Sequence, residues 1–253
     1  MNTERLNILG LHISRISYAG ALEQVAAWGR SHTPSYVCFA NVHMTIEGHK
    51  DPEFARQVNG ASLVVADGFP LAKACRLLYG QVQERIDGMG FLPRLIAFLN
   101  TGGYRIFLYG GSPKVLAALE QVIRRHYPRV EIAGAVSPPF RDLSSAEQED
   151  YIRQINESGA HVVFVALGCP KQERWMHRHH GRIKAVLLGV GGAFSVMAGL
   201  QKRAPQWMQE AGLEWVFRLA QEPRRLFKRY FVTNLLFVWL LGKQLLKKKV
   251  YGK

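Results

Sequence analysis

The sequence predicts an α/β fold: a Rossmann-like, mostly parallel sheet with helices on both faces, followed by a helical C-terminal appendage. Short apolar runs alternate with longer helical patterns, and this order is typical of a doubly wound sheet. The later runs are apolar at consecutive positions, which indicates strands buried on both faces. After about residue 203 no strand pattern remains.

The elements follow in chain order. The N-terminal segment "LNILGLHIS" predicts a small hairpin or edge element. Runs rich in β-branched and apolar residues then predict six strands, and apolar periodicity predicts helices between them. The strands are expected at 35–41, 62–67, 104–110, 130–136, 161–168 and 184–191, and the helices include 113–126, 145–157 and 170–180.

The C-terminal part has a different composition. Residues 201–253 contain twelve Lys or Arg and three Glu, a net charge of +9 out of +14 for the whole chain. Pro205 and Pro223 mark helix starts or breaks, and the segment predicts two or three helices. We therefore divide the chain into an α/β core, 1–200, and a basic, amphipathic appendage, 201–253. Clustered charge of this kind attracts an anionic partner: nucleic acid, phosphates or an anionic membrane.

The three cysteines are scattered and form no CxxC, which indicates neither a disulfide framework nor a zinc site. A reduced, cytosolic setting is expected. No apolar segment typical of a signal peptide follows the first methionine.

Several predicted strands end in small or polar residues at one sheet edge. Ligands of open parallel sheets bind outside the carboxyl ends of the strands, where glycines let backbone N–H groups approach an anion. A glycine at such a turn can equally serve the turn alone. No G-x-G-x-x-G with a later acid and no P-loop is found, which disfavours a dinucleotide site. The edge residues are Asn41, Asp67, Gly110, Gly111, Gly168 and Gly191.

Three side chains are candidates for chemistry. Asp67 directly follows an apolar strand, which suits a general base, although a turn or helix-capping role is equally open. Arg85 suits a bidentate grip on phosphate or a surface ion pair. Gln172 is expected in the first turn of a helix with its amide near the cleft. The histidines of "HRHH" at 177–180 have no acid or cysteine beside them that would complete a metal site. The D-x-D motif that commonly holds a divalent ion is also missing, so we expect no metal.

Together, "NVHM", "VVADGFPLA", "ERIDG", "GCPKQERWM" and "KRAPQWMQEAGLEWVFRLAQEPRRLFKRY" resemble the WecG/TagA/CpsF glycosyltransferases (glycosyltransferase family 26). The resemblance covers nearly the whole chain, and the last block is its most specific part. It implies an inverting, metal-independent enzyme of bacterial exopolysaccharide and cell-envelope synthesis that needs no cofactor. Such enzymes move glucose, N-acetylmannosamine or its uronic acid from a UDP-sugar to a polyprenyl-diphosphate-linked sugar.

The resemblance also implies roles for individual residues. Asp67 matches the catalytic base, and Arg85 and Gln172 match residues that line the donor or acceptor pocket. At Ser195 the family often has Asp, and at Gly90 it usually has an acid. Donor and diphosphate binding is expected from the appendage cations and from the sheet-edge loops: Asn41, Gly110, Gly111, Gly168, Gly191, Ser195, Arg218, Arg225 and Lys228.

The apolar run 230–241 is shorter than the ~20 residues needed to span a bilayer. Flanked by cations, it predicts a helix lying in the interface of an anionic membrane. The resemblance implies that this membrane is the bacterial inner membrane, at its cytoplasmic face. The alternative is a helix packed on the body or on a second subunit. A homo-oligomer would allow membrane binding and packing alike, because it could cover the apolar face when the protein is off the membrane. Apolar surface is expected from Phe227, Phe231, Leu235, Phe237, Val238, Trp239 and Leu241.

Other classes of protein remain as rivals. A nucleic-acid-binding protein would have basic residues interleaved with aromatics on the body, and none are seen, so we expect no nucleic-acid partner. A nucleotide-sugar epimerase would have the missing G-x-G-x-x-G. A non-catalytic membrane-surface protein on the same scaffold would not need Asp67, Arg85 or Gln172.

Overall fold

The computed structural model describes residues 3–251, apart from the side chains of Arg225, Lys228, Arg229 and Tyr251. Its centre is a six-stranded, fully parallel sheet of order β4-β3-β8-β7-β5-β6, which confirms the predicted α/β class. All six predicted strands form, as β3 (Ser35–Ala40), β4 (Leu63–Ala66), β5 (Arg105–Gly110), β6 (Glu131–Val136), β7 (Val162–Ala166) and β8 (Val186–Gly189).

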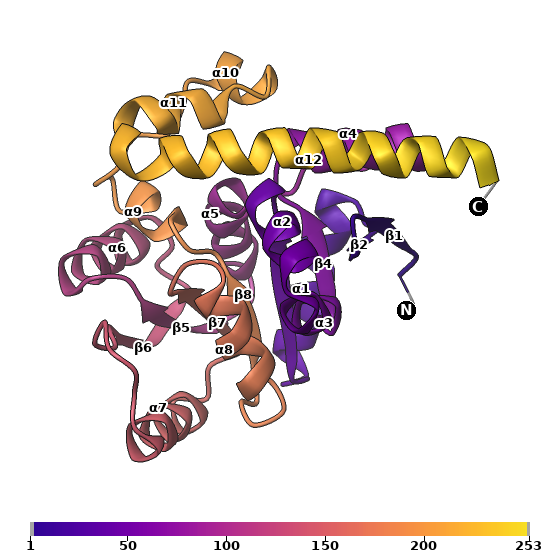
Figure 1. Cartoon of the computed structure of the whole chain (residues 1–253). Helices are drawn as coiled ribbons and strands as arrows, with labels where there is room; N and C mark the ends of the chain where they lie inside the picture. The colour runs from indigo at the N-terminus through magenta and orange to yellow at the C-terminus, as the bar shows by residue number, and fades with distance from the viewer. Residues whose placement is uncertain (1–2, 252–253) are drawn as a thin grey trace.

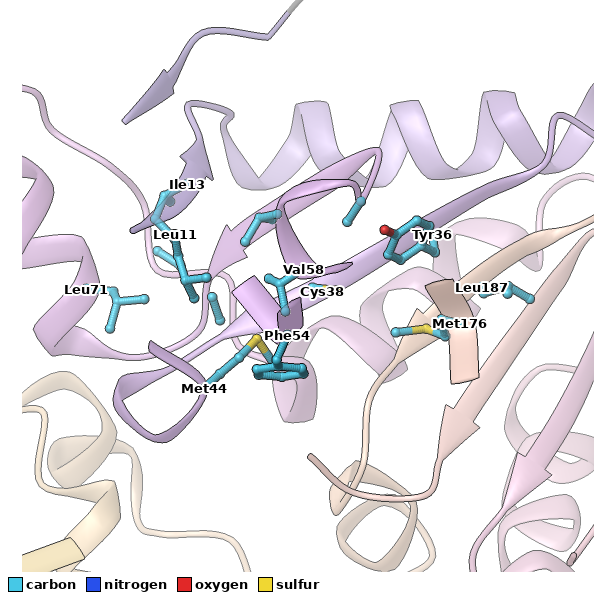
Figure 2. Packing of buried hydrophobic residues seen from close by; sticks show 14 of the residues in the cluster. Leu11, Ile13, Tyr36, Cys38, Met44, Phe54, Val58, Leu71, Met176 and Leu187 are labelled. Carbon is cyan, nitrogen blue, oxygen red and sulfur yellow. The ribbon is translucent and has the colours of Figure 1, made fainter. Parts of the chain in front are cut away.

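Consecutive apolar residues in the strands serve two separate cores. In β3, Tyr36 and Cys38 face one core, while Val37 and Phe39 face the other. Since side chains alternate along a strand, a strand buried on both faces must be apolar at every position. Figure 2 shows part of the first core, where Tyr36 and Cys38 lie among side chains from the neighbouring helices and the hairpin.

The helices divide between the two faces according to these cores. The first core is covered by α2 (Val42–Lys50), α3 (Pro52–Asn59), α4 (Phe69–Tyr79), α7 (Ser145–Glu157) and α8 (Lys171–His179). The second core is covered by α1 (Tyr18–Arg30), α5 (Gly88–Leu99), α6 (Pro113–His126) and α9 (Ala193–Met197).

The N-terminal segment forms the expected hairpin, from β1 (Arg5–Ile8) and β2 (Leu11–Ser14). Its two-residue turn places both Leu9 (φ 53°) and Gly10 (φ 98°) at positive φ. A tight antiparallel hairpin prefers this geometry, because it matches the twist of the flanking strands. The side chain of Asn7 accepts a hydrogen bond from the N–H of Gly10 and stabilises the turn.

The C-terminal segment forms three helices, α10 (Gln206–Glu210), α11 (Glu214–Gln221) and α12 (Pro223–Tyr251). Figure 1 shows α12 as a long helix across the body, with α10 and α11 next to its first turns. Phe237, Leu240 and Leu241 on α12 join the first core. The alternative that this helix packs on the body is therefore confirmed, and its place in a membrane interface stays a prediction. Phe237 and Leu241, which we expected on the apolar surface, are buried.

The far end of α12 contacts the start of the chain. The side chain of Gln244 accepts from the N–H of Leu9 and donates to the carbonyl of Asn7. Within residues 3–251, no helix is long and apolar enough to cross a membrane. The functional division at residue 200 stays a prediction.

Candidate functional site

The sheet has a topological switch point at its centre. The segments after β3 and β7 turn to the face of the first core, and the segment after β8, which lies between them, turns to the other face. Loops that diverge in this way leave a crevice at the carboxyl ends of the strands, where open α/β sheets bind ligands.

Asp67 lies at this edge, directly after β4. Its N–H donates to the carbonyl of Ala40, which fixes it beside the end of β3. Asn41 follows β3, and its side-chain amide donates to a carboxylate oxygen of Asp67 at 3.5 Å. The other end of the same amide accepts from the N–H of Met44 and caps α2. The structure therefore brings Asp67 and Asn41 together, as the sequence predicts.

The environment of Asp67 raises the pKa of its carboxyl group to about 7, from an ordinary value of 3.8. Burial is the main cause, and the negative charges of Asp87 and Glu214 add to it. The hydrogen bond from Asn41 and the positive charge of Arg218 act in the opposite direction. A carboxylate with a pKa near neutrality can accept a proton at the working pH, which is what a general base requires.

Arg85 is engaged by other protein groups. Its guanidinium lies 3.3 Å from Asp87 and 3.6 Å from Glu214, and it donates to the carbonyl of Gln209 at 3.1 Å. Arg203 in turn lies 2.6 Å from Asp87 and 3.6 Å from Glu214. We call these four side chains the charge network: Arg85, Asp87, Arg203 and Glu214.

Three members of the charge network escaped the sequence analysis. Asp87 stands within the motif "ERIDG" and Arg203 within "KRAPQW", so both lie in segments that the sequence singles out. Nothing in a linear sequence, however, pairs two charges that are 116 residues apart. The one local signal was Asp87 itself, because an Asp before a helical pattern is a typical N-cap. It accepts from the N–H of Gly90 and caps α5.

Gln172 lies in the first turn of α8, as expected, and is buried. Its amide oxygen accepts from the N–H of Gly168 at 3.1 Å, and its amide nitrogen donates to the carbonyl of Gly189 at 2.8 Å and to Glu173 at 2.7 Å. Gln172 thus ties the loop after β7 to the end of β8. Direct contact of its amide with a substrate stays a prediction.

Glu173 is a fully buried carboxyl group below these loops. Its Oε1 accepts from Gln172, and burial raises its pKa to about 7, from an ordinary value of 4.5. Because the folded state holds the proton more tightly than the unfolded state, Glu173 stabilises the fold fully below about pH 4.5. That stability is lost as the pH rises toward 7.

We expect Glu173→Gln to stabilise the protein at pH 8, because the amide keeps the acceptor oxygen and cannot ionise. The gain in the free energy of unfolding should be about 1–3 kcal/mol at pH 8 and should vanish near pH 4.5. Urea unfolding of wild type and variant at both pH values measures it. A constant difference between the two proteins at both pH values would contradict the ionisation of Glu173.

The glycines at the sheet edge adopt backbone conformations that disfavour side chains. Gly110, Gly111, Gly168 and Gly191 all have positive φ, between 52° and 107°. The N–H groups of Gly111 and Gly191 donate to carbonyls of β7, and that of Gly168 donates to Gln172. The turn role of these glycines is thus established, and their direct binding of a phosphate stays a prediction.

The appendage approaches the same edge through Arg218 of α11. A methyl group added at Gly192, in the loop after β8, would lie 3.8 Å from the guanidinium of Arg218. The Nε atom of Arg218 is buried and has no hydrogen-bond partner among the residues that the structure describes. Ser195 lies in α9, after this loop. Arg225 and Lys228 belong to α12, but their side chains lie outside the described part of the chain.

A cavity of about 470 Å³ lies between the core and the appendage, next to the loop that carries Asp67. Aromatic, cationic, amide and acidic side chains line it together, a mixture suited to a polar ligand with apolar faces. Its walls come from α4, α5, α10 and the segment before α5: Phe69, Arg85, Arg94, Gln206, Gln209 and Glu210.

The histidines of "HRHH" serve packing. His177 lies 3.0 Å from the hydroxyl of Tyr36, and His180 bonds the carbonyl of His177. Among residues 3–251, no group of three or more His, Cys, Asp or Glu side chains is placed to hold a metal ion. The three cysteines are free: Cys38 and Cys75 are buried, and Cys169 is half-buried.

Comparison with known proteins agrees with this arrangement. Residues 6–251 match the model of the "Glycosyl transferase WecG/TagA/CpsF family". The chain is 32% identical over 214 residues to the N-acetylglucosaminyldiphosphoundecaprenol N-acetyl-beta-D-mannosaminyltransferase of Bacillus subtilis (strain 168), covering 84% of this chain and 81% of that protein. It is 25% identical over 250 residues to the enzyme of the same name from Staphylococcus aureus (strain MW2), covering 98% and 96%. The chain therefore belongs to the WecG/TagA/CpsF family and is a glycosyltransferase.

Proposed function

We propose that this enzyme transfers N-acetylmannosamine from a UDP-sugar to N-acetylglucosamine linked through a diphosphate to a polyprenyl lipid. The names of the two relatives support this choice of sugar and acceptor, ahead of glucose or the uronic acid. The observation that carries the reaction is the position of Asp67: a carboxyl group with a pKa of about 7, beside Asn41 at the carboxyl edge of the sheet.

In the proposed reaction, Asp67 takes the proton of an acceptor hydroxyl as that oxygen attacks the anomeric carbon of the donor sugar. The bond from the anomeric carbon to UDP breaks on the opposite side, so the configuration inverts. The leaving diphosphate carries negative charge that cations and backbone dipoles stabilise. We assign this role to Arg218, and the support is its guanidinium near Gly192 in the loop after β8.

We further propose that the enzyme meets its lipid-linked acceptor with the outer face of α12, at the cytoplasmic face of the inner membrane. Phe231, Leu235 and Trp239 are each more than half exposed there, and they share a shallow apolar hollow of about 520 Å³ with Val232 and Leu236. An exposed apolar helix face rich in aromatics and flanked by cations suits insertion into the interface of an anionic bilayer.

We expect the double substitution Phe231→Gln with Trp239→Gln to weaken binding to vesicles of phosphatidylglycerol by at least tenfold, because it removes two large exposed aromatic groups of this face. Vesicle co-sedimentation measures the effect. The matched control is Leu77→Gln with Val82→Gln, which removes two equally exposed apolar residues outside the appendage. Equal loss in both double variants would contradict a membrane role for α12.

A UDP-release assay tests the function. It uses a panel of UDP-sugars with a short-chain polyprenyl-diphosphate N-acetylglucosamine acceptor, with and without EDTA. We expect release that depends on the acceptor, is fastest with UDP-N-acetylmannosamine and is indifferent to EDTA. Faster release from UDP-glucose would overturn the sugar assignment and keep the reaction class. Release that is equally fast without acceptor would overturn transfer to the lipid.

A further inference from the structure

We propose that the charge network is a latch that fixes the appendage over the loop carrying Asp67, and that Asp87 and Arg203 are therefore positioning residues for the transfer. Arg85 and Asp87 belong to the core, and Arg203 and Glu214 belong to the appendage. Each arginine contacts both acids and each acid contacts both arginines, so the four side chains form a closed circuit with no net charge.

The latch is largely removed from water. The side chains of Asp87 and Arg203 are 12% and 25% exposed, and those of Arg85 and Glu214 are 21% and 17% exposed. Charges so shielded attract one another more strongly than surface pairs, and removing one member leaves an uncompensated charge in a poorly solvated place. Asp87 is the fixed point, because its Oδ1 also accepts from the N–H of Gly90 at the start of α5.

Two further contacts extend the latch toward the loop that carries Asp67. Arg85 donates to the carbonyl of Gln209 at the end of α10. The turn after α10 lies on Phe69, where a methyl group at Gly212 would meet the aromatic ring at 3.0 Å. Phe69 is two residues from Asp67, so a displaced appendage would uncover the loop that carries the base.

The latch also sets the charges that surround Asp67. The groups acting on its carboxyl group are Asp87 and Glu214, which favour its neutral form, and Asn41 and Arg218, which favour its ionised form. Three of these four belong to the latch or to the appendage that it holds. The consequence for catalysis rests on the proposed function of Asp67 as the base, whereas the mechanical role of the latch does not.

Hydrogen–deuterium exchange on the full chain tests the mechanical role. We expect Arg203→Gln to speed amide exchange in residues 206–221 about tenfold or more, because a charge-assisted bond is lost, while exchange in β3, β7 and β8 stays unchanged. Arg182→Gln is the matched control, since it removes the exposed partner of Glu149 with the same change in charge. Arg203→Lys, which keeps the charge, should show an intermediate rate and guards against misfolding of the first variant.

Kinetics test the positioning role. We expect Glu214→Gln to shift the acidic limb of the pH profile of kcat/KM to lower pH and Arg182→Gln to leave it in place, a difference that a merely structural role would not produce. Unchanged exchange of residues 206–221 in both Arg203→Gln and Glu214→Gln would overturn the latch. Absence of transfer by the wild type with every donor would overturn the proposed function, and the exchange data would still decide the latch.

Discussion

Replacing Asp67 by Asn should lower kcat for acceptor-dependent UDP release by about 100- to 10,000-fold, the contribution typical of a general base. The amide keeps the shape of the side chain and its place beside Asn41 but cannot accept a proton from the acceptor. Because burial raises the pKa of Asp67 to about 7, the wild type should show a kcat/KM that falls about tenfold per pH unit below this value and levels off above it.

The same substitution should leave the fold intact or more stable. The folded state holds the proton of Asp67 more tightly than the unfolded state, so ionisation costs stability as the pH rises from about 3.8 toward 7. Asp67→Asn removes this cost and should raise the melting temperature at pH 8. If the variant does not fold, the pH profile of the wild type tests the role of Asp67 instead. A wild-type profile of kcat/KM without an acidic limb near pH 7 would contradict that role.

The largest expected effect on stability comes from Gly110→Ala. Gly110 pairs with Ala166 in the neighbouring strand, and a methyl group there would lie 2.6 Å from the carbonyl oxygen of Ala166, at a φ of 107°. Backbone strain and overpacking together should lower the free energy of unfolding by about 2–6 kcal/mol. Urea unfolding at pH 7 measures the change.

Gly168→Ala is the matched control for this prediction. Gly168 lies at the carboxyl edge of the adjacent strand with a φ of 80°, but no atom lies within 4 Å of an added methyl group. Its cost should be that of the left-handed conformation alone, about 1–2 kcal/mol. Equal losses at Gly110 and Gly168 would show that the contact with Ala166 does not decide the outcome.

The strands were predictable because their residues are mostly apolar and are also mostly buried in the folded protein. Every residue of β3 is buried, and its sequence is a continuous apolar run after Ser35. The order of such runs and helices leaves few topologies. The placement of Asp67 and Asn41 at one edge followed from the same logic. Predicting the strands and the edge residues required no knowledge of contacts between distant parts of the chain. It required only the rule that parallel strands end at the same edge of a sheet.

The parts that escaped prediction depend on tertiary pairing. The hydrogen bond from Gln172 to the carbonyl of Gly189 is one example, because it joins the loop after β7 to the end of a strand 17 residues later. The buried face of α12 was visible in principle, since Leu226, Thr233, Phe237 and Leu240 recur at helical spacing. The strong apolar character of the opposite face masked this periodicity.

The contact between Gln244 and the hairpin turn has a consequence for how the protein is made. This contact joins residues more than 230 positions apart, and α12 is synthesised after every element on which it packs. Domains fold as units, from the N-terminus first, during translation. The sheet can thus assemble on the ribosome while its first core still lacks Phe237 and Leu240, and long-range closure of this kind is slow. The first core therefore gains Phe237 and Leu240, and Phe69 beside Asp67 gains its contact with the turn at Gly212, only after the whole sheet has been synthesised.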